Sequence, residues 1–214
     1  MSTRKPLPFV VGMALAAGVL SAGAAEAKVK RSCAVRGTRI LTIDTTGRLA
    51  LHVGSEPGAD NVLYGCLNRT RRPRTLAVLS FVSAFAEDVR TPRLAAPLAA
   101  FNRFGGGPAA RCYSRIEVWN LQTGTRQRRV TAQTDAGGDD VCGVVDGLVL
   151  SRTGTAAWIA HDPKSGATEV RKLGGGGAVT LDTGNIDRGS LALSGDGVIA
   201  YWTRDRIPHS SPMN

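Results

Sequence analysis

Four cysteines are the residues of this 214-residue chain with the clearest chemistry. No pair has the Cys-x-x-Cys spacing of zinc sites and redox-active thiols, so that spacing gives little support to either. In an exported chain, four cysteines predict two disulfides, with three possible pairings. We favour the sequential pairing, because each bridge then closes a loop of about 30 residues and contributes about 3–4 kcal/mol in the chain-entropy model. The expected bridges are Cys33–Cys66 and Cys112–Cys142.

Other residue types with catalytic or metal-binding chemistry form no recognisable motif. Three histidines are far apart in the sequence: His52, His161 and His209. Four aspartates lack the alternating oxygens of a calcium loop: Asp135, Asp139, Asp140 and Asp146. The segment 182–187 comes closer to such a loop, and we interpret it as a turn between repeats. We therefore predict no catalytic residue, no cofactor and no metal ligand.

Arginines form the one candidate binding feature. The chain carries 27 Lys and Arg against 17 Asp and Glu, a net charge of +10. Seven arginines fall at related places on two predicted outer hairpins: Arg69, Arg71, Arg72, Arg74, Arg126, Arg128 and Arg129. Arg126 and Arg128 would project to one face of an extended strand, so two neighbouring repeats could present a basic strip to an anionic envelope polymer or to nucleic-acid phosphates. An alternative explanation for the same arginines is that their charge prevents an exposed strand edge from pairing with another chain.

Nucleic acid is the less expected of these polyanions. No aromatic side chains stand between the arginines, and stacking on aromatic rings is what single-stranded nucleic acid requires. The partner that we expect is a protein or an anionic envelope polymer.

An internal repeat indicates the elements that position these residues. The segment 148–158 recurs as 191–201, with five of eleven positions identical. Each copy has an apolar strand, a polar turn with glycine and a second strand, which is typical of a β-hairpin. A second hairpin turns at Thr123-Gly124 and again at Ser165-Gly166, and Arg71 stands where the corresponding glycine would be.

Two hairpins in each repeat give about four strands per unit, and periods of roughly 40–50 residues with four strands predict a β-propeller. The sequence therefore predicts an all-β, small β-propeller-like domain of about four blades. The expected blades are 36–80, 89–133, 145–183 and 188–212. We expect Trp119, Trp158 and Tyr201 between the blades.

Three alternatives remain open at this point. A two-sheet β-sandwich with a chance repeat fits the same strands, and a short helix fits the periodicity of 79–89. The last blade shows at most three strands, and residues 38–43 or 29–31 could supply its missing edge.

The Trp119-Asn-Leu-Gln-Thr-Gly124 turn and the Leu-x-Leu-Ser strands that end in Ala-Trp158 or Ala-Tyr201 resemble blades of bacterial secreted β-propeller repeat proteins of the WD-repeat or TolB type. The Gly-His and Trp-Asp pairs of WD repeats are absent, and so is an Asp-Gly turn in every unit. The resemblance implies the fold and a binding role. It carries over no site residues, because this fold hosts many activities.

Residues 1–27 have the pattern of a signal peptide. Arg4 and Lys5 precede an apolar run from 9 to 25, and Ala25-Glu26-Ala27 offers a cleavage site. Retention of this segment as an uncleaved anchor is the alternative. We expect a mature domain of 28–214, secreted or in the cell envelope, with no membrane span after cleavage.

Together these features predict a secreted, non-catalytic binding module that is monomeric. The alternative is a hydrolase or lyase acting on a carbohydrate or a lactone, with carboxylates around a central channel. Three or more Asp, Glu or His side chains converging on one point would favour the enzyme.

Overall fold

The computed structural model describes residues 33–54, 60–82, 85–107, 110–133 and 142–214. All of them belong to one compact unit, Arg31–Asn214. The expected signal peptide, the candidate edge at 29–31 and Asp135, Asp139 and Asp140 lie outside the described residues.

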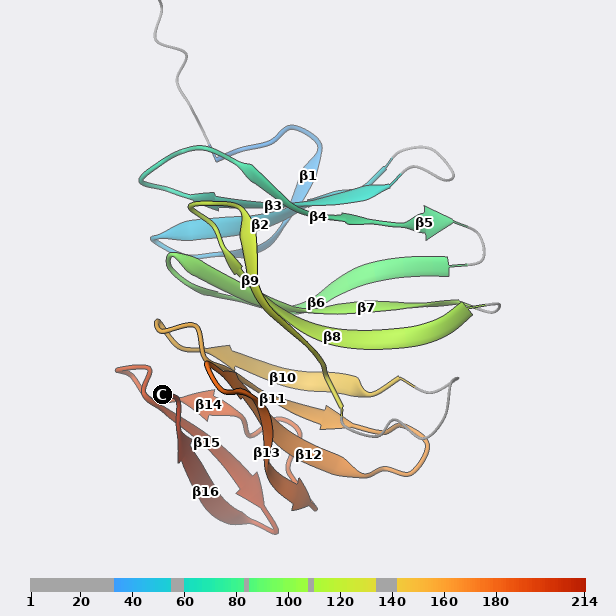
Figure 1. Cartoon of the computed structure of the whole chain (residues 1–214), viewed down its shortest axis with the longest axis vertical. Helices are drawn as coiled ribbons and strands as arrows, with labels where there is room; N and C mark the ends of the chain where they lie inside the picture. The colour runs from blue at the N-terminus through green and yellow to red at the C-terminus, as the bar shows by residue number, and fades with distance from the viewer. Residues whose placement is uncertain (1–32, 55–59, 83–84, 108–109, 134–141) are drawn as a thin grey trace, which may run out of the picture. The chain divides into compact units, whose positions relative to one another are not determined.

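The described residues form four antiparallel sheets and no helix (Figure 1), which confirms the all-β class. The first sheet contains β1 (Thr38–Ile43), β2 (Gly47–His52), β3 (Asn61–Leu67) and β4 (Arg74–Leu79). The second contains β5 (Phe81–Val82), β6 (Phe85–Ala95), β7 (Leu98–Gly107), β8 (Ala110–Asn120) and β9 (Thr125–Thr131). The third contains β10 (Val144–Leu150), β11 (Ala156–His161), β12 (Thr168–Gly174) and β13 (Gly177–Gly184). The fourth contains β14 (Ala192–Leu193), β15 (Ile199–Arg204) and β16 (Ile207–Pro212).

Within each sheet, every strand pairs with the strand that follows it in the chain, so each sheet is a meander. Two expectations are corrected by this topology. Residues 38–43 form β1 beside β2 and do not complete the fourth sheet. In place of a helix over 79–89, the described residues form β5 and the start of β6, where Glu87 and Val89 are buried and Asp88 is exposed, as the period of a strand requires.

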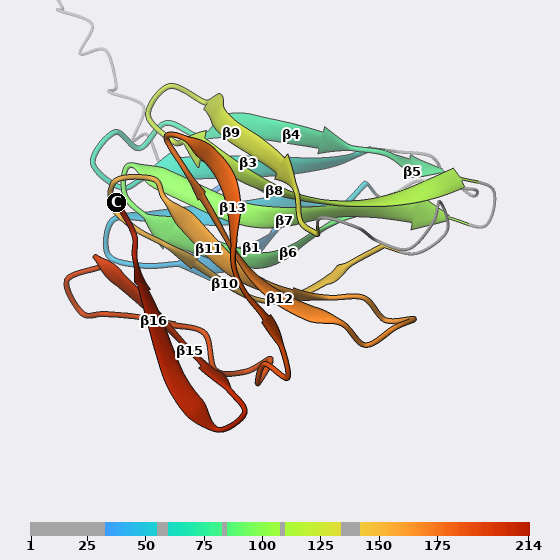
Figure 2. The ribbon, with the colours of Figure 1, turned by 60° about the horizontal axis from the view of Figure 1, so that its bottom comes forward.

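Apolar clusters join each sheet to the next one in the chain. In Figure 1 the sheets follow one another in that order, and Figure 2 brings the fourth sheet toward the viewer. Leu49, Leu51 and Leu63 of the first sheet pack with Phe101 and Trp119 of the second. The opposite face of the second sheet packs on the third through Ala100, Ile116, Val118, Val145, Leu148 and Trp158. The third sheet packs on the fourth through Val149, Ala157, Ile159, Val170, Ala200, Trp202 and Met213.

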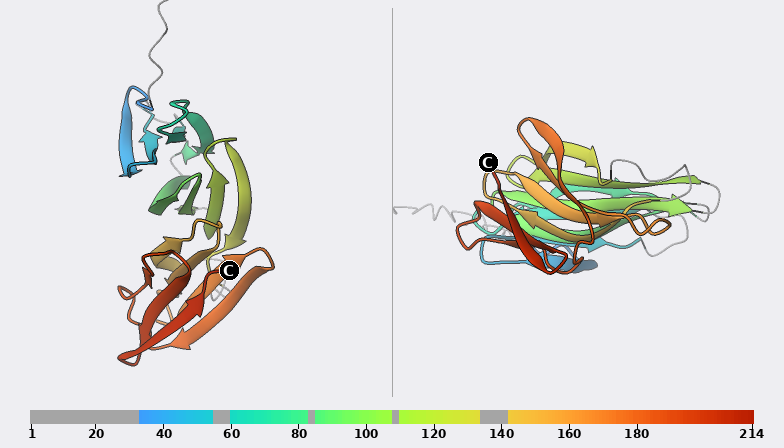
Figure 3. Two further views of the ribbon diagram at one scale, coloured as in Figure 1. Left: turned by 90° about the vertical axis from the view of Figure 1, so that its left-hand side faces the viewer. Right: turned by 90° about the horizontal axis from the view of Figure 1, so that it is seen from below.

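The same order of sheets is visible in the left-hand view of Figure 3. Four sheets stacked in sequence exclude the two-sheet sandwich. Among the described residues no apolar cluster joins the fourth sheet to the first, so these residues do not form a closed ring.

The two copies of the sequence repeat differ by one residue in their turns. In the third sheet the amide of Ser151 donates to the carbonyl of Thr155, whereas in the fourth the amide of Ser194 donates to Ile199, one position further on. A shift of one residue moves every following side chain to the other face of a sheet.

The repeat predicted that Tyr201 lies between sheets. This prediction is wrong, because Tyr201 is 42% exposed. Trp202 takes the buried position instead and is 4% exposed, while Trp119 and Trp158 lie between sheets as expected.

Three of the outer turns share one backbone conformation. The amides of Arg71, Gly124 and Gly166 each donate to the carbonyl four residues earlier, at 2.8–2.9 Å. Their φ angles are 49°, 74° and 74°, in the left-handed region that favours glycine. Arg71 thus occupies the position of the glycine in the other two turns.

Candidate polyanion-binding surface

Two disulfides cross-link the described residues, and the first lies next to the arginine-bearing β3–β4 connection. Cys33 is bonded to Cys66 of β3, and Cys112 of β8 to Cys142, with Cα–Cα distances of 5.6 and 5.7 Å. The pairing is the sequential one. The second bridge connects the second sheet to the segment that enters the third, across residues 134–141, which are not described.

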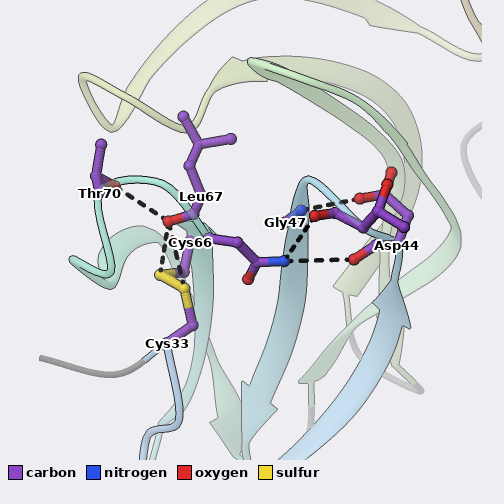
Figure 4. Close-up of a disulfide and its surroundings, with 8 residues drawn as sticks. Cys33, Asp44, Gly47, Cys66, Leu67 and Thr70 are labelled. Atoms are coloured by element: carbon purple, nitrogen blue, oxygen red, sulfur yellow. Dashed lines mark hydrogen bonds between the residues drawn. A yellow bond between two sulfur atoms is a disulfide. The ribbon is translucent and has the colours of Figure 1, made fainter.

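The first disulfide lies beside the end of β3 and the start of the β3–β4 connection (Figure 4). The carbonyl oxygen of Leu67 is 3.5 Å from the Sγ atom of Cys33 and accepts a 3.2 Å hydrogen bond from the hydroxyl of Thr70. The side-chain Nδ2 atom of Asn68 donates to the carbonyl of Thr45 at 3.1 Å, which links this connection to the β1–β2 turn. The base of the arginine-bearing loop is therefore anchored on two sides.

Six of the seven arginines are exposed, and Arg128 is half-buried. Arg69, Arg71 and Arg72 lie in the β3–β4 connection, and Arg74 begins β4. The other three lie on β9: Arg126, Arg128 and Arg129.

The β3–β4 and β8–β9 turns, far apart in the sequence, lie side by side. The Nη2 atom of Arg69 donates to the Oε1 atom of Gln122 at 2.5 Å. A Cβ atom added to Gly124 would be only 3.2 Å from the Cβ atom of Arg74. The structure therefore brings the arginines of the first sheet next to the hairpin that carries those of the second.

Arg126 and Arg128 do not share a face, contrary to the sequence prediction. Arg126 pairs with Trp119 and Arg128 with Val118, with a β-bulge between the two pairs. In a regular strand, residues two positions apart lie on the same face. The extra residue of a bulge between them places them on opposite faces. Arg126 lies toward the first sheet, whereas Arg128 donates to the carbonyl of Gly154 at the third.

Arg129 pairs directly with Glu117, so it lies on the same face as Arg126. The arginines that gather at the first and second sheets are thus Arg69, Arg71, Arg72, Arg74, Arg126 and Arg129, and we call this set the basic surface. Within the described part of the chain, the guanidinium groups of Arg71, Arg72, Arg74 and Arg129 have no hydrogen-bond or ion-pair partner.

One buried carboxylate lies beneath the basic surface. Glu117 is fully buried, and its Oε2 atom accepts a 2.8 Å hydrogen bond from the indole of Trp119. Its Oε1 atom is 3.6 Å from the Nη1 atom of Arg126. Arg126 therefore balances an internal charge, while the four unpartnered arginines are available to an external anion.

The other candidate residues are bonded within the protein. Asp182 accepts hydrogen bonds from the indole of Trp202 at 2.7 Å and from Arg204. Burial alone would raise its pKa, but the hydrogen bonds from Trp202, the Thr183 amide and Arg204 outweigh burial and hold that pKa below its ordinary value. His161 is 2.6 Å from Asp146 through its Nδ1 atom. The described residues contain no group of three His, Cys, Asp or Glu side chains that could hold a metal ion.

One pocket escaped the sequence analysis. A cavity of about 480 Å³ is lined by one hairpin turn from each of the four sheets, at residues 44–46, 94–96, 150 and 152, and 193–197. The acidic groups that line it accept hydrogen bonds within their own turns. For example, Asp44 accepts hydrogen bonds from Thr46 and Gly47, which lower its pKa against the opposing effect of burial. No motif could have indicated this pocket, since each sheet contributes only a short turn.

These observations define an all-β protein of four stacked meander sheets with two disulfides and a basic surface across the first two sheets. No family model matches the sequence, and no curated protein matches it. Across the described ranges, no helix is long and apolar enough to cross a membrane.

Proposed function

We propose that this chain is an exported, non-catalytic binding module of the β-propeller kind that holds an anionic polymer of the cell envelope on its basic surface. The observation that carries the proposal is the group of four exposed, unpartnered guanidinium groups at Arg71, Arg72, Arg74 and Arg129. Arginine's planar fork of donors fits phosphate, sulfate and carboxylate groups.

The arrangement suits a repeating ligand better than a small one. The arginines lie on exposed turns and an outer strand of two sheets, so their charges are spread along a surface and do not converge in a pocket. A polymer with many weakly bound charges gains affinity from each contact through release of its counterions. Such binding weakens steeply as salt concentration rises.

The propeller part of the proposal rests on the repeated packing. Each sheet is a meander that packs on the next, and the equivalent turns of all four line a single cavity. Stacked four-stranded units around a common axis are the defining arrangement of propellers.

Export is supported by two independent features. Residues 1–27 have the charged, apolar and small-residue regions of a signal peptide. The two disulfides indicate an oxidising, extracytoplasmic environment. We therefore propose that the protein is secreted or resides in the cell envelope.

Heparin chromatography and sedimentation with inorganic polyphosphate test the binding. We expect an Arg71→Glu/Arg72→Glu variant to elute from heparin at clearly lower salt and to lose most of its polyphosphate binding. The control is Arg152→Glu/Arg188→Glu, which changes the net charge equally at two exposed arginines outside the basic surface. Equal shifts for both variants would mean that only net charge matters, and no shift in the first would dismiss the basic surface.

A further inference from the structure

A second, smaller pocket adjoins the basic surface. It has a volume of about 380 Å³ and is lined by the β1–β2 turn, by the end of β3 with the β3–β4 connection, and by the β6–β7 turn. Figure 4 shows the two connections that form its first-sheet side, at Leu67 and at the turn from Asp44 to Gly47. Arg69 belongs both to the lining of this pocket and to the basic surface. A ligand on the basic surface therefore has a cavity of defined size beside it.

The lining of this pocket is apolar on one part and polar without a negative charge on the other. Leu67, which is 1% exposed, contributes carbon surface together with Ala96 and Pro97. Polar groups come from Thr45 and Asn68, and within the described structure no hydrogen bond engages the Thr45 hydroxyl or the Oδ1 atom of Asn68. None of the described residues that line it has a carboxylate or an aromatic side chain. Apolar walls with a few placed polar groups are typical of sites for small organic groups.

Arg69 is held in place at this pocket, unlike the unpartnered arginines of the basic surface. Its Nη2 atom donates to the Oε1 atom of Gln122 at 2.5 Å, across from the first sheet to the β8–β9 turn. A guanidinium group has several further N–H donors, and no described residue engages those of Arg69. A group that is oriented before the ligand arrives loses less conformational freedom on binding. Arg69 therefore offers a fixed set of donors to an anion at the pocket.

The walls of the pocket are fixed by backbone hydrogen bonds. The amide of Asn68 donates to the carbonyl of Thr46 at 2.9 Å, which joins the two first-sheet connections. The carbonyl of Pro97 accepts a 2.9 Å hydrogen bond from the amide of Leu121, which joins the β6–β7 turn to the β8–β9 turn. The pocket is therefore formed without a ligand, as most small-molecule sites are.

The charges around the pocket set the direction of a bound ligand. Thr45, Thr46 and Ala96 also line the cavity of about 480 Å³, which contains the carboxylate of Asp44. Arg69 lines only the smaller pocket. A negative group is more stable beside the guanidinium than beside the carboxylate. The negative group of a ligand therefore lies at Arg69, and its neutral part lies in the pocket.

We propose that this pocket holds a sugar ring of an acidic glycan and that Arg69 binds the negative group carried by that ring or by the next one. The inference rests on the proposed function and names the class of polymer, a carbohydrate that bears carboxylate, sulfate or phosphate groups. A sugar ring has a face of C–H groups that packs on Leu67 and Pro97, and hydroxyl groups that bond to Thr45 and Asn68. A bare polyphosphate chain has no carbon surface to bury on the apolar wall.

Titration calorimetry of the exported, oxidised protein with a heparin oligosaccharide and with inorganic polyphosphate tests the proposal. Thr45→Trp fills the pocket from an exposed position. We expect it to lower the affinity for the oligosaccharide about tenfold, or about 1.4 kcal/mol, and to leave the affinity for polyphosphate unchanged. Retained polyphosphate binding also shows that the variant is folded. The control is Thr183→Trp, the same change at an exposed threonine of β13 in the third sheet, which should alter neither affinity.

Arg69→Lys is a second, independent variant. It keeps the positive charge but loses the planar fork of donors, so we expect weaker binding of the oligosaccharide and little change for polyphosphate. If Thr45→Trp lowers both affinities equally, or lowers neither, the pocket does not hold a sugar ring and the inference is overturned while polyanion binding stands. A wild type that binds neither polymer would overturn the proposed function and this inference together.

Discussion

The β3–β4 turn allows a quantitative prediction, because an arginine adopts there the backbone conformation that two other turns give to glycine. Arg71 has a φ of 49°, and the equivalent Gly166 has a φ of 74°. An L-residue in the left-handed region costs roughly 1–2 kcal/mol, because its Cβ atom approaches the following carbonyl. Replacing Arg71 with glycine removes that cost.

The gain is partly offset in the unfolded chain. Glycine has more conformational freedom to lose on folding, which costs about 0.4–1 kcal/mol. Arg71→Gly should therefore stabilise the protein by about 0.5–1 kcal/mol, or roughly 1–4 °C in Tm for a domain of this size. The guanidinium group of Arg71 has no partner in the described structure, so its removal adds no further loss.

Gly166→Ala is the reverse experiment. A Cβ atom added at Gly166 meets no atom within 4 Å, so only the backbone conformation is changed. We expect a loss of about 0.5–1 kcal/mol, equal and opposite to the gain at Arg71. Thermal and denaturant unfolding of the oxidised proteins measure both. A destabilised Arg71→Gly together with an unchanged Gly166→Ala would refute the argument.

Two further predictions concern stability. Reduction of Cys112–Cys142, or a Cys112→Ser/Cys142→Ser variant, should lower the free energy of unfolding by about 3–4 kcal/mol in the chain-entropy model, and a denaturant midpoint equal to that of the wild type would contradict this. Because the pKa of Asp182 is lower in the folded protein than its ordinary value of 3.8, its ionised form stabilises the fold above pH 3.8, and this contribution is lost as the pH falls through the lowered pKa. Asp182→Asn should therefore flatten the decline of Tm between neutral pH and about pH 2, and a decline identical to that of the wild type would show that other carboxylates dominate.

Local patterns were sufficient for several features of this protein. The hairpins around Gly124 and Gly166 are predicted by a glycine turn between two segments in which apolar and polar residues alternate. This pattern lies within a short stretch of sequence. Comparison with those two turns also placed Arg71 at the position of their glycines, and the structure then shows that it shares their left-handed backbone. The order of the cysteines and the loop sizes that each bridge would close were enough to favour the sequential pairing.

At two places, local patterns could not predict the face of the sheet from which a side chain projects. Tyr201 and Trp202 exchange their expected sides because one turn is a residue longer than its repeat. Arg126 and Arg128 separate because of a bulge in the pairing of β8 with β9. Side chains in a strand alternate with a period of two, so a single inserted residue reverses the face, while the sequence pattern on either side looks unchanged.

The sequence by itself determined that the chain is all-β, built from repeated hairpins and crossed by two bridges, because these depend on short-range alternation, turn residues and cysteine count. Only the tertiary structure decided which arginines meet, which aromatic residue is buried, and that the described sheets stop short of a ring. Those outcomes depend on register and on packing between sheets distant in the chain, where a displacement of one residue costs little locally and changes which side chains meet.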